Sequence, residues 1–273
     1  HADIHVLQAD PATRKDPAAR AELLASADIA ILCLPDDAAR ESVDLAAGKT
    51  RILDASSAHR TDAAWQYGLP ELTTQSRAEI AAAQYVSNPG CYPQGFVLLV
   101  RPLIEAGLLS RDMPLRCNAV SGYSGGGRQM IEQFQAMDAN TANNLAVQSY
   151  GLDQGHKHLP EMTAFSGTLV APIFVPSVAH YDQGMLTQIP LFASELGGVS
   201  PAQVHAVLAE RYAAEPFIHV ADLGDRSMLQ GNFLNPTARN NSNDMDLFVF
   251  GDTQRLVLCA RYDNLGKDLS TVQ

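Results

Sequence analysis

The early part of the chain alternates strand-like and helix-like segments, and this order limits the fold more than any other feature. The segments are, in order, residues 3–8 (strand), 16–27 (helix), 28–34 (strand), 37–47 (helix) and 51–55 (strand). The run DIAILCL ends at Pro35 and is apolar throughout, which is typical of a buried parallel strand. Gly48 is suited to end the second helix. The order predicts an α/β fold with a doubly wound, Rossmann-like parallel sheet.

Beyond Cys91 the pattern changes to many strands with few helices. Helices are predicted at residues 94–109, with a bend at Pro102, and at residues 199–212, with Ser200 as N-cap; strands are predicted at residues 114–122, 168–178, 184–190, 217–221, 247–252 and 256–262. Such a run predicts a second, α+β domain with a mixed, mostly antiparallel sheet. We therefore expect a dinucleotide-binding domain at residues 1–90 and a catalytic and oligomerisation domain at residues 91–263. Residues 264–273 are expected to return to the first domain.

Composition excludes several classes of protein. The 273 residues include 46% hydrophobic and 18% charged ones, as in a globular protein with a large core. The formal net charge of -11 argues against non-specific binding of nucleic acid. No apolar run reaches the length of about 18 residues that a membrane span needs, and the first residues do not form a secretion signal. Four cysteines without zinc or disulfide spacing favour a reducing cytoplasm.

The segment VSNPGCYPQG, residues 86–95, is the sharpest local feature. Pro89 and Gly90 predict a tight turn, which places Cys91 in an exposed position just before a helix. The positive end of a helix favours a thiolate and stabilises an oxyanion, so Cys91 is a candidate nucleophile. Simple packing of Cys91 is the alternative. The other cysteines, Cys33, Cys117 and Cys259, lie in apolar contexts and are expected to pack as small hydrophobic residues.

A thiolate needs an acid or base, and GHKHLPEM, residues 155–162, offers His156 and His158. In an extended segment both rings point to one face, whereas a helix starting at Pro160 places His158 near its N-terminus. Metal binding is an alternative, but no third ligand stands at a familiar spacing.

Three further segments are candidate ligand sites. GYSGGGR, residues 122–128, offers backbone amides, Ser124 and Arg128 to an anion. The loops after two predicted strands are candidates for a nucleotide crevice and contain Leu34, Pro35, Ser56, Ser57 and Arg60. Arg14 and Lys15 follow the first predicted strand, where a 2′-phosphate would favour NADP over NAD. Asp10 nearby leaves that choice open, and a solvated turn is the alternative.

Taken together, SNPGCYP, GYSGGGR, HKHLPE and FVPSVAHYDQGML resemble the N-acetyl-gamma-glutamyl-phosphate reductase family, in its shorter variant. The resemblance extends over nearly the whole chain, with ADIAILCLPDDAARE, LDASSAHR, YGLPEL and DNLGK. This family is related to aspartate-semialdehyde dehydrogenase in fold and chemistry. The resemblance implies a homo-oligomer, a dimer or tetramer, that uses NADPH to reduce N-acetyl-glutamyl phosphate through a cysteine thioester in arginine biosynthesis.

The resemblance also implies roles for individual residues. Cys91 corresponds to the nucleophile, His158 to the acid/base group and His156 to a substrate contact. Positions expected to contact or support the substrate are Asn88, Arg101, Ser124, Arg128 and Glu161; positions expected at the cofactor are Arg14, Lys15, Leu34, Pro35, Ser56, Ser57 and Asn264.

Departures from the family pattern leave alternatives open. The first strand and its glycine-rich turn are absent before His1, the usual small-residue helix does not follow DNLGK, and Gln94 stands where Thr is usual. The expectation is a truncated form that binds NADPH weakly. The alternatives are an aspartyl- or aminoadipyl-phosphate reductase, a non-catalytic homologue, and a cysteine hydrolase without cofactor.

Overall fold

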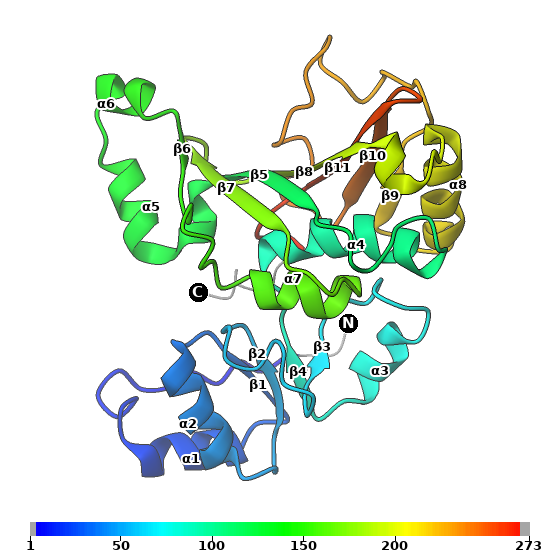
Figure 1. Ribbon diagram of the computed structural model, residues 1–273. Coiled ribbons are helices and arrows are strands. Elements are labelled where there is room, and N and C mark those ends of the chain that lie inside the picture. Colours follow the sequence, from blue (N-terminus) through cyan, green and yellow to red (C-terminus); the bar gives the residue numbers. More distant parts are fainter. Residues whose placement is uncertain (1–3, 268–273) are drawn as a thin grey trace. The chain divides into compact units, whose positions relative to one another are not determined.

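The computed structural model describes residues 4–267 and divides them into two compact units, residues 4–89 and 90–267 (Figure 1). Asn264 belongs to the second unit. The segment predicted to return to the first domain, residues 264–273, is described only as far as residue 267. Residues 268–273 lie outside the described residues.

The first unit contains a four-stranded parallel sheet. Its strands lie in the order β1 (Ile29–Leu32), β2 (Arg51–Asp54), β4 (Tyr85–Ser87) and β3 (Gln66–Tyr67), and its helices are α1 (Pro17–Ala25), α2 (Asp36–Ala46) and α3 (Ser76–Ala82). Asp16 caps α1 by accepting from the amide of Ala18. Leu32, Ala39 and Ile52 form the centre of its core. The predicted parallel sheet is confirmed.

Two predictions in this unit are wrong. Residues 4–8 form no strand, and the side chains of Ile4 and Val6 are 86% and 70% exposed. A strand needs a neighbour for its amide and carbonyl groups, and alternation alone does not supply one. The second wrong prediction is that residues 28–34 form a buried strand. Because β1 is the edge strand of the sheet, Ile29 and Ile31 are largely exposed, and Cys33 just beyond it is exposed as well.

The second unit is a mixed sheet with helices α4 and α7 along one face (Figure 1). The strands lie in the order β6 (Val147–Ser149), β7 (Ile173–Ala179), β5 (Arg116–Gly122), β8 (Met185–Phe192), β11 (Arg255–Tyr262), β10 (Met245–Gly251) and β9 (Ile218–Val220). The helices are α4 (Cys91–Glu105), α5 (Gly127–Gln135), α6 (Ala139–Asn144), α7 (Leu159–Ser166) and α8 (Pro201–Tyr212), with short 3-10 turns at Tyr123–Gly126 and Ala193–Leu196. Only the β5–β7 and β9–β10 pairs are parallel, which confirms the mostly antiparallel sheet.

Helix α4 is the central helix of this unit, with twelve of its fifteen residues buried. It begins at Cys91, three residues earlier than the sequence pattern predicts, because Gly90 is extended and serves as N-cap. Pro93 is tolerated in the first turn, where no intrahelical bond needs its missing N–H. Gly95 is required by close approach, since a Cβ there would lie 2.8 Å from the Tyr262 hydroxyl and ring.

Candidate active site

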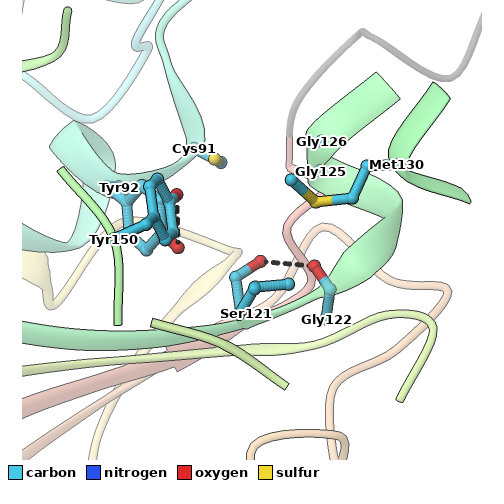
Figure 2. Close-up of a pocket in the computed structure, with 9 residues that line it drawn as sticks. Cys91, Tyr92, Ser121, Gly122, Gly125, Gly126, Met130 and Tyr150 are labelled. Carbon is cyan, nitrogen blue, oxygen red and sulfur yellow. Dashed lines mark hydrogen bonds between the residues drawn. The ribbon is translucent and has the colours of Figure 1, made fainter. Parts of the chain in front are cut away.

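Cys91 lies at the start of α4 and lines a small cavity in the second unit (Figure 2). The cavity has a volume of about 30 Å³, room for roughly one water molecule. Its other lining residues are Tyr92, Ser121, Gly122, Gly125, Gly126, Met130, Tyr150 and Val178. The segments VSNPGCYPQG and GYSGGGR, far apart in the sequence, therefore meet at one site.

Three hydrogen bonds hold the start of α4. The carboxylate of Glu161, on α7, accepts from the Gly90 amide at 2.8 Å. The Tyr262 hydroxyl, on β11, donates to the Cys91 carbonyl at 2.8 Å and accepts from the Gly95 amide at 3.3 Å. Glu161 and Tyr262 are almost fully buried, so these contacts fix the backbone that carries the Cys91 thiol.

The four thiols differ in their surroundings, and not as the sequence suggests. Cys91 is only 9% exposed, so its expected exposure is wrong, whereas Cys33 is exposed and does not pack as expected. Cys117 and Cys259 are buried as predicted. Burial raises the pKa of Cys259 to about 12 and that of Cys117 still further, so neither is a thiolate at neutral pH.

The two histidines of the HKH segment contact one another. His158 is the residue before α7 and is 4% exposed, and its ring centroid lies 4.7 Å from that of His156. The His158 amide donates to His156 Nδ1 at 3.2 Å, so the neutral His156 ring carries its proton on Nε2. Burial, together with the charge of Lys157, lowers the pKa of His156 below its ordinary value. His156 is therefore a neutral hydrogen-bond donor at pH 7.

A tyrosine pair connects the cavity to these histidines. The Tyr150 hydroxyl donates to the Tyr92 hydroxyl at 3.1 Å (Figure 2). The Tyr92 hydroxyl in turn donates to the Ser177 carbonyl at 3.2 Å. The Tyr92 ring centroid lies 5.8 Å from that of His158, and the Tyr150 centroid lies 5.7 Å from that of His156. Burial raises the pKa of Tyr150 to about 12 and raises that of Tyr92 as well, so both phenols are neutral.

Sequence reasoning missed both tyrosines. Tyr92 directly follows the candidate nucleophile, and its position next to Cys91 was the available clue. Tyr150 stands in an ordinary strand-to-loop context, and only the antiparallel pairing of β6 with β7 brings this segment toward the cavity.

Ser124 and Asn264 lie together in the second unit. The Ser124 hydroxyl donates to the Asp182 carbonyl at 2.6 Å and accepts from Asn264 Nδ2 at 3.1 Å, while Asn264 Oδ1 accepts from the Gly184 amide. These bonds attach the glycine-rich segment to the loop before β8. The sequence placed Ser124 with the substrate and Asn264 with the cofactor, and the structure makes them direct neighbours.

The structure does not bring the two candidate arginines to the cavity. The Arg128 side chain is 85% exposed and pairs with Glu132 one turn along α5. Arg101 lies ten residues after Cys91 on α4, or about 15 Å along the helix. It bonds Glu105 and the Phe165 carbonyl, which connects α4 to α7.

In the first unit, the loops after β1 and β2 come together. The Ser57 hydroxyl and amide both donate to Asp36, which follows the exposed Leu34 and Pro35. Ser56 donates through its amide and hydroxyl to buried Asp54, which also bonds His59.

The remaining first-unit candidates are distributed over the loop and the end of the sheet. Arg60 is buried and donates to the Ala55 carbonyl. Asn88 is buried just after the end of β4, and its backbone N–H donates to the Asp54 carbonyl.

Arg14 lines a groove of about 370 Å³ in the same unit. Thr13 and Arg20 also line it, together with the acidic Asp10 and Glu22. Arg20 is engaged by Glu41 and Ser42, whereas the exposed Arg14 faces the groove from the turn before α1. Lys15 is exposed beside it and does not line the groove.

Residues 4–267 contain no cluster of three or more His, Cys, Asp or Glu side chains arranged to hold a metal ion. Over the same residues, no helix combines the length and apolar character that crossing a membrane requires.

Comparison with known proteins places this chain in a family. Residues 6–82 match the model of the semialdehyde dehydrogenase NAD binding domain, and residues 91–264 match that of the semialdehyde dehydrogenase dimerisation domain. Among solved structures, aspartate semialdehyde dehydrogenase II from Vibrio cholerae superposes with a TM-score of 0.68 at 15% identity, over 89% of this chain and 76% of that one. The enzyme from Francisella tularensis gives the same TM-score at 13% identity, over 91% and 80%. Fold and domains together define an oxidoreductase of the semialdehyde dehydrogenase class.

Sequence relatives narrow the class further. N-acetyl-gamma-glutamyl-phosphate reductase 2 of Nostoc sp. is 47% identical over 98% of this chain and 86% of its own length. The N-acetyl-gamma-glutamyl-phosphate reductase of Brucella suis is also 47% identical, over 98% of this chain and 87% of its own. The chain belongs to the N-acetyl-gamma-glutamyl-phosphate reductase family, which confirms the resemblance seen in the sequence.

Proposed function

We propose that this protein reduces N-acetyl-glutamyl 5-phosphate to N-acetyl-glutamate 5-semialdehyde with release of phosphate, using NADPH, as a step of arginine biosynthesis. The observation that carries the proposal is the position of Cys91 at the start of α4, in a cavity shared with Tyr150. The names of the relatives supply the substrate.

In the proposed reaction the Cys91 thiolate attacks the acyl-phosphate carbonyl. A bond forms between Sγ and the acyl carbon, and the bond from that carbon to the phosphate oxygen breaks, giving a thioester and free phosphate. The nicotinamide cofactor, which Arg14 in the first-unit groove would hold by its 2′-phosphate, would supply a hydride to the acyl carbon. Amides at the start of α4 stabilise the oxyanion that results.

The histidines then divide two tasks. His158 gives a proton to the thiohemiacetal oxygen and takes it back when the adduct collapses. The collapse breaks the bond between the carbon and Sγ, restores the thiolate and releases the aldehyde. His156, neutral with its proton on Nε2, binds the substrate as a hydrogen-bond donor. Tyr92 and Tyr150, as neutral phenols, lie between the cavity and the rings of His156 and His158 and together contact both rings.

The direct test is turnover of purified protein with N-acetyl-glutamyl phosphate and NADPH, followed by loss of NADPH absorbance and by detection of the aldehyde. Aspartyl phosphate and aminoadipyl phosphate serve as competing substrates. A higher kcat/KM for either would overturn the substrate assignment. Release of N-acetyl-glutamate without NADPH consumption would identify a cysteine hydrolase, and absence of both reactions with absence of NADPH binding would identify a non-catalytic homologue.

The cofactor choice is tested at Arg14. If the guanidinium in the groove pairs with the 2′-phosphate, Arg14→Ala should raise the KM for NADPH about tenfold, as loss of a charge-assisted hydrogen bond of about 1.4 kcal/mol does. The KM for NADH, which has no 2′-phosphate, should stay unchanged. Arg77→Ala, at an exposed arginine of α3, is the matched control. Equal changes for both cofactors would remove Arg14 from phosphate recognition.

A homo-oligomer in the cytoplasm is part of the proposal, supported by the match of residues 91–264 to a dimerisation domain. Light scattering coupled to size-exclusion chromatography should give the mass of a dimer or tetramer of the 29.3 kDa chain. A mass equal to one chain at micromolar concentration would contradict it.

A further inference from the structure

The first turn of α4 contains a buried carboxamide that the reaction described above does not use. Gln94 is 1% exposed, and within the described residues both its Nε2 and its Oε1 are buried without a hydrogen-bond partner. A buried polar group without a hydrogen-bond partner destabilises the folded state. Because native interiors rarely contain unsatisfied polar groups, a group of this kind next to a reactive thiol is a candidate for contact with the reacting molecule.

The helix places Gln94 next to Cys91. The two residues are three apart on α4, so their Cβ atoms lie about 5–6 Å from each other on the same surface of the helix. Helical side chains lean toward the N-terminus of their helix. Gln94 does not itself line the small cavity at Cys91, but this tendency brings its carboxamide within reach of an acyl group bonded to Sγ.

The start of α4 is short of donors for an acyl oxygen. The Gly90 amide is engaged by Glu161, and Pro93 in the first turn has no N–H. Two of the first four N–H positions of this helix end are therefore not offered to an acyl oxygen. The Gln94 side chain, on the same face of the helix as Cys91, would add an N–H donor for the acyl oxygen.

We propose that Gln94 is a catalytic residue whose Nε2 donates a hydrogen bond to the oxygen of the acyl group on Cys91. Negative charge develops on that oxygen when the Sγ–carbon bond forms, and again when the thioester accepts hydride. The bond is therefore strongest in the transition states. The inference rests on the proposed function in one respect, that Cys91 is the residue acylated.

The test uses Gln94→Met, which keeps the shape of the side chain and removes its hydrogen-bonding atoms. We expect kcat to fall about 10²–10³-fold, the usual effect of losing one oxyanion donor, with little change in KM. We expect the melting temperature to stay the same or rise, because an unsatisfied carboxamide is removed from the interior. Gln75→Met, at the exposed start of α3, is the control and should change neither quantity.

A second measurement separates this inference from the substrate assignment. In p-nitrophenyl acetate, attack by Sγ forms a thioester and breaks the ester bond to release nitrophenolate, with no need of NADPH or the natural substrate. Gln94→Met should slow this acylation of Cys91 as well. If wild-type protein is acylated at Cys91 but does not reduce N-acetyl-glutamyl phosphate, the proposed function fails while the Gln94 comparison still stands. An unchanged acylation rate in the variant, or a lower rate together with a lower melting temperature, would overturn the inference.

Discussion

Replacing Cys91 by serine should abolish reduction of the acyl phosphate, with kcat lowered by about 10⁴-fold or more and the fold unchanged. The thiolate is the attacking group, and a serine hydroxyl at the same position is almost entirely protonated at neutral pH. Because serine is of similar size and Cys91 lines a cavity that also contains Ser121 and Tyr150, the melting temperature should change little. NADPH oxidation by wild-type and variant protein measures the effect.

The exposure of Cys33 determines the control. Because Cys33 is exposed and Cys91 is not, the rate of labelling by iodoacetamide depends on how accessible each thiol is as well as on how reactive it is. We therefore expect Cys33 to be labelled rapidly. Cys33→Ser should therefore remove the rapidly labelled thiol while leaving kcat unchanged, and Cys91→Ser should remove activity while leaving that labelling. Retention of activity in Cys91→Ser, or its loss in Cys33→Ser, would move the nucleophile away from α4.

The predictable part of the fold came from segments with a strong period. The helix starts at Asp16 and Ser200, both followed by a proline, appear in the structure as capped helices. The strands of the second unit also fall near their predicted positions. What the sequence could not show is which strand lies at the edge of a sheet, because that depends on pairing between distant segments. This is why Ile29, Ile31 and Cys33 were expected to be buried and are exposed.

The site divides in the same way. Cys91, His156 and His158 could be proposed from the sequence because each stands in a short motif whose local chemistry is informative. The neighbours that give the site its geometry come from distant strands and helices: Tyr150 from the β6–β7 side, Tyr262 from β11 and Glu161 from α7. Arg101 and Arg128 show the reverse case, since a charged side chain near a motif has no required direction and both bond a carboxylate one turn away.

The histidines give the second large expected effect. His158→Asn should lower kcat about 10²–10⁴-fold with little change in KM, because the thiohemiacetal oxyanion would lose its proton donor. His156→Asn should mainly raise the KM for the acyl phosphate, because its Nε2–H is a hydrogen-bond donor and its lowered pKa keeps the ring neutral. Steady-state kinetics of the two variants with the same substrate measures the difference.

The assignment of the two rings depends on their different positions. His158 is 4% exposed and begins α7, whereas His156 accepts the His158 amide on Nδ1 and so has only Nε2 to offer a ligand. His219→Asn, at an exposed histidine of β9 paired with Asp244, is the matched control and should leave both constants unchanged. A fall in kcat for His156→Asn with a rise in KM for His158→Asn would exchange the two roles, and normal kinetics in both variants would exclude the HKH segment from the mechanism.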